Sequence, residues 1–130
     1  MIIVLTTYPD LDSAKEAARK IVEKELAACV SIIKIEESVY RWKGEVKSGN
    51  EYLLFIKTTK KAYLQLETFI KQKHTYELPE VIMLEAKGGC KHYLEWISSN
   101  TLFNLVRVPL DLKGLKRKEE SAKKPKTLSL

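Results

Sequence analysis

The sequence predicts an α+β fold, a split β-α-β sandwich with one added helix. Its apolar segments follow the order strand, helix, strand, strand, helix, strand, and a further helical segment comes last. With right-handed crossovers, this order places both main helices on one face of a four-stranded sheet, with strands one and three adjacent in the middle. The first and third strands are also the most continuously apolar, which favours central positions. We expect these two strands to run parallel.

The N-terminal half begins with a buried strand and a helix. Residues 2–8, "IIVLTTY", are almost all apolar or β-branched, as central strands are. Residues 9–26 follow with aspartates and Ser13 as candidate caps and with Glu16 placed for a capping box. The alanines and aliphatic residues of this segment recur at helical spacing, so we expect one buried stripe.

The next segments predict a long hairpin. Residues 28–46 read as a long or bent strand, "KSGN" at 47–50 supplies turn residues, and "EYLLFIKT" at 51–58 forms the returning arm. The second strand then lies at a sheet edge and projects beyond a sheet of this size. Because long exposed edges are usually covered or paired, we expect the hairpin to bond to another subunit.

The C-terminal half predicts a helix, a strand and a short helix. Thr58 or Thr59 is expected to cap a helix that continues to Lys73. "PEVIMLEA" at 79–86 then forms a strand. The pair Gly88-Gly89 ends it before a helix that contains "HYLEWI".

Length and charge predict one domain with a basic tail. We divide the 130 residues into a folded domain, 1–106, and a flexible C-terminal tail, 107–130. The tail holds eight Lys or Arg and three acidic residues, so it carries a net +5 of the chain's +6. A nucleic-acid or other acidic partner is therefore expected only through the tail. With two cysteines, no apolar run long enough for a membrane span and no leader pattern, we expect a reduced, cytoplasmic protein that contacts no membrane.

Enzymatic signatures are missing from the sequence. It contains no glycine-rich phosphate loop, no GxSxG elbow and no HExxH pair. An RNA-recognition sheet would need stacked aromatics on one face of strand three, but Tyr52 and Phe55 are three residues apart and alternate in face. We therefore predict a protein that is not an enzyme and uses no organic cofactor.

Five segments in register resemble the CutA family of divalent-cation-tolerance proteins. They are "ELAACVSII", "SVYRWKGEV", "LLFIKT", "HTYELPEVIML" and "YLEWI", and the resemblance covers roughly residues 2–100. The resemblance implies a ferredoxin-like homotrimer, similar in architecture to PII-type signalling proteins and linked to tolerance of copper and other divalent metals. Thr75 stands where the family usually has proline, and the tail has no counterpart in the family pattern.

Three residues are candidate metal ligands. Cys29 is either a small buried hydrophobe or a soft ligand for copper or zinc. His74 either interacts with the carbonyls at a helix end or turns its imidazole into a cleft, where Glu77 could orient it or share an ion. A closed site that adds Cys90 and His92 fits no zinc spacing, so any metal site is expected to be shallow or shared between subunits.

Four residues are candidate contacts for a small ligand. Tyr40 and Trp42 share a face of the hairpin, either in an interface or as the lining of a cleft. Tyr76 is a candidate for packing or recognition, and Lys57 could contact an anion. We therefore predict a trimer that binds a divalent metal or a small anion between its subunits, in metal tolerance or signalling. The alternative is a trimeric scaffold that presents basic tails to an acidic partner.

Overall fold

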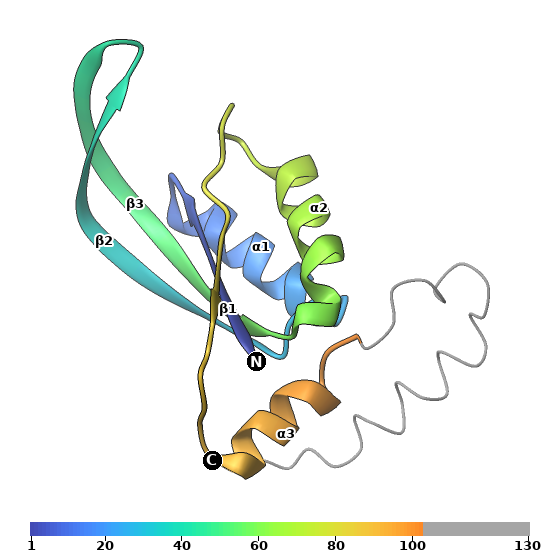
Figure 1. Ribbon diagram of the computed structural model, residues 1–130. Helices are drawn as coiled ribbons and strands as arrows, with labels where there is room; N and C mark the ends of the chain where they lie inside the picture. The colour runs from blue at the N-terminus through green and yellow to red at the C-terminus, as the bar shows by residue number, and fades with distance from the viewer. Residues whose placement is uncertain (103–130) are drawn as a thin grey trace.

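The computed structural model describes residues 1–102 and shows a four-stranded sheet with helices (Figure 1). Two helices, α1 and α2, lie on the same side of this sheet, and α3 lies beyond its end (Figure 1). The tail assigned to 107–130 lies outside the described residues. The elements, in chain order, are β1 (Ile2–Tyr8), α1 (Leu11–Glu23), β2 (Cys29–Trp42), β3 (Glu45–Thr58), the short 3₁₀ helix η1 (Lys60–Ala62), α2 (Tyr63–Lys73), β4 (Ile82–Glu85) and α3 (Lys91–Ser99).

The sheet has the predicted strand order but is antiparallel throughout. Its order is β2-β3-β1-β4, so the two most apolar strands are central and β2 lies at an edge, as predicted. The prediction that strands one and three run parallel was wrong, because β1 and β3 pair antiparallel. The crossover through α1 makes β1 and β2 run the same way, and the hairpin then reverses β3 against both.

The hairpin turn lies earlier in the chain than predicted. Lys43 and Gly44 form a two-residue turn, and both have positive φ angles, 51° and 81°. This is the backbone that tight hairpins favour, because its twist matches that of the strands. The segment 47–50, predicted as the turn, is instead part of β3.

Strand β2 contains a bulge where it pairs with β3. The register moves from Ile35 opposite Glu51 to Ser38 opposite Gly49, so β2 has one residue more than β3 at this point. The Asn50 side chain donates a hydrogen bond to the Glu36 carbonyl at 2.9 Å and ties the two strands together there. One extra residue exchanges the two faces of a strand, so residues 38, 40 and 42 lie on the face that residues 33 and 35 occupy before the bulge.

The core lies between the helices and one face of the sheet. Alanines and Ile21 of α1 and three large apolar residues of α2 pack against the even-numbered residues of β1 and β3. Asp10 caps the start of helix α1, and its Oδ1 accepts a hydrogen bond from the Ser13 amide at 2.7 Å. No threonine side chain caps η1 or α2. Thr58 instead donates to the Leu26 carbonyl at 2.7 Å.

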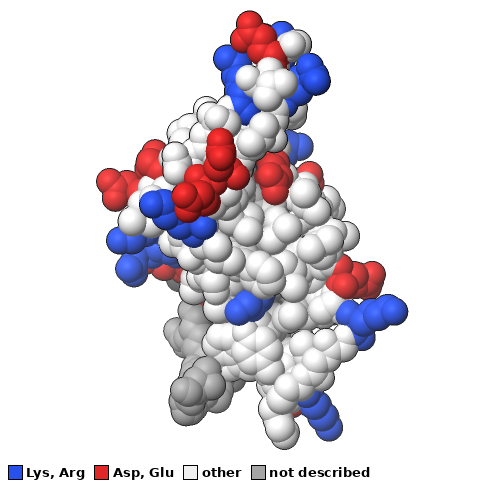
Figure 2. Space-filling view, turned by 90° about the vertical axis from the view of Figure 1, so that its left-hand side faces the viewer, with Lys and Arg blue, Asp and Glu red and all other residues white. Residues whose placement is uncertain are grey.

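The opposite face of the sheet is apolar, and no helix within residues 1–102 lies over it (Figure 1). Among the described residues, half-buried and exposed side chains from all four strands lie on this open face. They include Ile3, Leu5, Ile33, Leu53, Phe55, Ile82 and Leu84. Ile33 remains 45% exposed and Leu84 47%. Figure 2, seen from the side of the hairpin strands, shows a broad area almost without charge below the charged hairpin tip.

No helix within residues 1–102 is long and apolar enough to cross a membrane.

Candidate functional site

A pocket of about 490 Å³ lies at one end of the open face, where the hairpin begins to project beyond β1. We call this place the hairpin base. The hairpin contributes one wall, the segment after α2 contributes the other, and Thr7 of β1 lies at the bottom. The lining residues are Thr7, Ser38, Val39, Tyr40, Trp42, Glu51, Tyr76, Glu77, Leu78 and Glu80. The bulge is what brings Tyr40 and Trp42 to this side of the sheet.

His74 holds the segment after α2 against the sheet. Its ring stacks on Tyr8, with ring centroids 4.2 Å apart, and packs against Tyr76 at 5.0 Å. The Tyr76 amide donates a hydrogen bond to Nδ1 at 3.1 Å, so Nδ1 carries no proton. The proton is therefore on Nε2, which donates to the Thr7 carbonyl at 2.7 Å.

Burial keeps this imidazole neutral. It lowers the pKa of His74 below the ordinary 6.5, although the Thr7 carbonyl and the negative Glu51 act in the opposite direction. Because both ring nitrogens are engaged, His74 could coordinate a metal only by giving up one of these hydrogen bonds.

Glu51 joins the two walls of the pocket. One carboxylate oxygen accepts a hydrogen bond from Ser38 at 2.9 Å, and the other accepts one from the Tyr76 hydroxyl at 2.7 Å. Burial and this bond to Glu51 raise the pKa of Tyr76, so the phenol stays protonated. Partial burial and then the charge of Glu51 raise the pKa of Glu80, even though much of its side chain is exposed.

The structure brings four of the seven predicted site residues into this pocket. Tyr40, Trp42, Tyr76 and Glu77 line it, and His74 lies directly behind Tyr76.

The other two predicted residues lie elsewhere on the open face. Cys29 pairs with Lys57 across the strands, and Lys57 pairs with Ile3, whereas His74 contacts Thr7 at the other end of β1. The Lys57 amine is 3.8 Å from the Cys29 sulfur. Cys29 is a free, half-buried cysteine.

Within residues 1–102, no three His, Cys, Asp or Glu side chains lie close enough together to hold a metal ion. The three predicted metal ligands Cys29, His74 and Glu77 therefore form no site within one chain.

Sequence reasoning missed four polar residues of the pocket, namely Thr7, Ser38, Glu51 and Glu80. The contact between Ser38 and Glu51 depends on the bulge, which brings Ser38 to the face of the sheet on which Glu51 lies. In the sequence, only Gly49 and Asn50 indicate the bulge, and they do so weakly. Glu80 is exposed and lines the pocket from the segment between α2 and β4.

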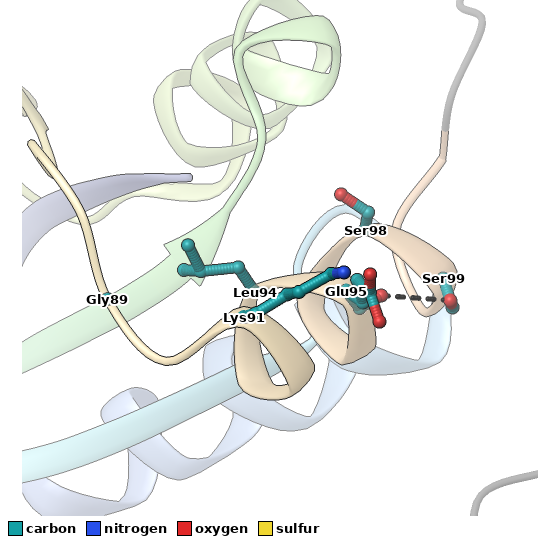
Figure 3. A pocket seen from close by; sticks show the side chains of 6 residues that line it. All are labelled: Gly89, Lys91, Leu94, Glu95, Ser98 and Ser99. Atoms are coloured by element: carbon teal, nitrogen blue, oxygen red, sulfur yellow. Dashed lines mark hydrogen bonds between the residues drawn. The ribbon is translucent and has the colours of Figure 1, made fainter.

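A second hollow lies along α3 (Figure 3). It is lined by Gly89 and by Lys91, Leu94, Glu95, Ser98 and Ser99 of one helix face. The Ser99 hydroxyl donates to the Glu95 carbonyl of the same helix at 2.9 Å, so this side chain is already used locally. Because one helix supplies nearly all the lining, we place the candidate site at the hairpin base.

Fold and pocket together define a small ferredoxin-like α+β protein with a long hairpin and a pocket of ligand size beside an open apolar face. Residues 2–100 match the family described as "CutA1 divalent ion tolerance protein". The chain belongs to this family, as its sequence motifs predicted.

Similar proteins occur in plants and bacteria. The chain is 43% identical over 100 residues to "Protein CutA, chloroplastic" of Arabidopsis thaliana, in a match that covers 77% of this chain and 55% of the plant protein. The solved divalent cation tolerance protein of Thermus thermophilus is 41% identical, has a TM-score of 0.76, and is matched over 78% of this chain and 100% of its own. A solved "PII-like protein CutA" of Nostoc is 32% identical with a TM-score of 0.75, over 79% of this chain and 99% of its own.

Proposed function

We propose that this chain forms a homotrimer and acts in tolerance of divalent metal ions by binding ligands rather than by catalysis. The observation that carries the proposal is the open apolar face of the sheet, together with the pocket at its end. The family match supports the link to metal tolerance, and the number of subunits is the one that the resemblance of the sequence motifs implies.

The open face supports assembly on physical grounds. Apolar side chains from all four strands lie on one side of the sheet, and no helix of the described residues 1–102 covers them. Large exposed apolar areas mark interfaces. Copies of the chain that pack through this face would remove it from water. The pocket opens at the end of the same face, so it would border the contact between subunits.

A signalling role is supported by the type of ligand pocket and by one relative. The pocket combines aromatic walls with a few fixed polar groups, as small-ligand sites usually do. The Nostoc relative carries the description "PII-like". We propose that a ligand at the subunit boundary changes how the hairpin is presented to other molecules. A cytoplasmic location stays a prediction, and an Archaeoglobus relative is described as periplasmic.

For copper, we propose a site that is shared between subunits and includes Cys29. Residues 1–102 of a single chain hold no cluster of three ligating side chains. Cys29 lies on the open face, where a second subunit could add donors, and its thiol suits Cu(I). His74 is the less accessible of the predicted ligands because its two ring nitrogens are already engaged.

A copper titration of the full-length protein tests this proposal. We expect Cys29→Ser to weaken Cu(I) binding at least about tenfold, because the hydroxyl lacks the soft thiolate donor. Cys90→Ser is the matched control, since Cys90 is exposed and lies at the start of α3. Isothermal titration with both variants measures the difference. Equal affinity in wild type and Cys29→Ser would contradict a role for Cys29, and unchanged binding in His74→Ala would remove His74 from the ligand set.

A further inference from the structure

We propose that the pocket at the hairpin base binds an organic ammonium ion, an amine cation with a compact alkyl body. The inference rests on the proposed ligand-binding role of this pocket and names the chemical class of its ligand. An ammonium ion takes the place of the small anion that Lys57 was predicted to contact, because Lys57 does not line the pocket.

The charges of the lining favour a cation. All of the charged side chains that line the pocket are glutamates, namely Glu51, Glu77 and Glu80. Glu51 already acts to raise the pKa of Glu80, so the two carboxylates repel each other. A positive ligand would relieve that repulsion, whereas an anion would add to it.

Charged groups of both signs lie near the pocket without lining it, and the amine of Lys43 lies 5.9 Å from the centroid of the Trp42 ring. Asp10, at the start of α1, adds a further negative charge that acts on Tyr76. Lys47 lies across the strands from Tyr40, but its amine is 3.6 Å from the Glu45 carboxylate and it does not line the pocket.

The uncharged part of the lining fits an organic cation. Tyr40, Trp42 and Tyr76 contribute aromatic rings, and Val39 and Leu78 contribute aliphatic surface. Aromatic faces attract ammonium groups through the ring quadrupole, and aliphatic walls accept the alkyl body. The volume of about 490 Å³ lies within the range of small-molecule sites.

The same features make this pocket a poor site for a bare metal ion. Metals need several donor atoms at bonding distance, and aromatic rings supply none. Both oxygens of Glu51 accept hydrogen bonds from Ser38 and Tyr76, and no three ligating side chains of residues 1–102 are grouped together. An ammonium ion needs only charge, a hydrogen-bond acceptor and an aromatic surface.

The test is a titration of the full-length protein with n-butylammonium, followed by NMR of the Trp42 indole. The ligand control is n-butanol, which has the same alkyl chain and no charge. We expect saturable shifts of the Trp42 indole resonance with n-butylammonium and none at equal concentrations of n-butanol. Glu51→Gln and Trp42→Leu should each weaken binding by about fivefold or more, and fluorescence or calorimetry replaces the indole signal in the Trp42 variant.

The matched control variant is Glu16→Gln, which removes an exposed carboxylate from α1, away from the pocket. It should bind like wild type. Equal binding of n-butanol and n-butylammonium, or unchanged binding in Glu51→Gln, would overturn the inference. Neither outcome bears on the proposed trimer or on the proposed copper site at Cys29. The trimer is tested by the mass in solution, and the copper site is tested by copper titration. If Cu(II) rather than the amine shifts the Trp42 resonance, the pocket is a metal site and the inference is wrong.

Discussion

At the scale of single residues, His74 explains how a loop without regular structure can form one wall of a site. Its ring stacks on Tyr8 and packs at a tilt against Tyr76, and its two nitrogens join Thr7 to the backbone of Tyr76. Thr75, in the position where the family usually has proline, gives up some backbone rigidity. The imidazole supplies that rigidity through contacts. His74 therefore positions Tyr76 for its bond to Glu51.

The lowered pKa of His74 predicts how the stability of the folded chain depends on pH. The unfolded chain binds a proton at the ordinary value of 6.5, and the folded chain binds it only at lower pH. Stability should therefore be fully present above 6.5 and fall as pH decreases through the lower, folded pKa. His74→Gln should flatten this decrease, because glutamine does not titrate.

Urea denaturation midpoints at about pH 7.5 and about pH 5.5 measure the effect, on either side of the ordinary histidine pKa. His92→Gln is the control, because the His92 side chain is 91% exposed. It should retain the wild-type decrease. An equal decrease in wild type and His74→Gln would show that the imidazole is not the titrating group.

At the scale of elements, the sequence predicts the type and order of the strands and helices better than it predicts how they are joined. Continuous apolar runs and helical spacing identified β1, α1, β3 and α2, because burial demands such patterns. The hairpin turn was misplaced because "KSGN" contains the stronger turn residues, whereas Lys43 adopts a positive φ angle without being glycine or asparagine. The misplaced turn concealed the bulge, and with it the partners Ser38 and Glu51.

The connection between β3 and α2 gives a prediction with its own control. Thr58 is buried and donates to the Leu26 carbonyl, which ties the end of β3 to the segment after α1. Thr58→Val should lower the free energy of unfolding by about 1–2 kcal/mol, because the carbonyl loses its partner in a buried place.

The hydroxyl of the next residue, Thr59, is buried and has no hydrogen-bond partner among the described residues. Thr59→Val should therefore leave stability unchanged or raise it slightly. Denaturant unfolding of the two variants compares them directly. Equal losses in both would show that the bond from Thr58 to Leu26 contributes nothing specific.

At the scale of the whole molecule, the open sheet face is the region where a single chain leaves many apolar side chains exposed to water. Its apolar residues come from four strands that extend from Ile2 to Glu85, so the fold was needed to show them as one surface. The sequence did predict the edge position of β2 and the projecting hairpin. It could not place the pocket, because the lining depends on the one-residue bulge and on the contacts of His74.

We propose that this face joins the subunits of a trimer, and the mass of the protein in solution is the measurement that tests this assembly. Light scattering should give the mass of three chains of 15.0 kDa for wild type, with or without Cu(II). Ile33→Lys places a charge on the open face at a side chain that is 45% exposed, so the single chain should tolerate it while the trimer dissociates. Leu64→Lys, at a side chain on α2 that is 65% exposed, is the control and should remain trimeric. A monomeric wild type, or a trimeric Ile33→Lys variant, would contradict the claim.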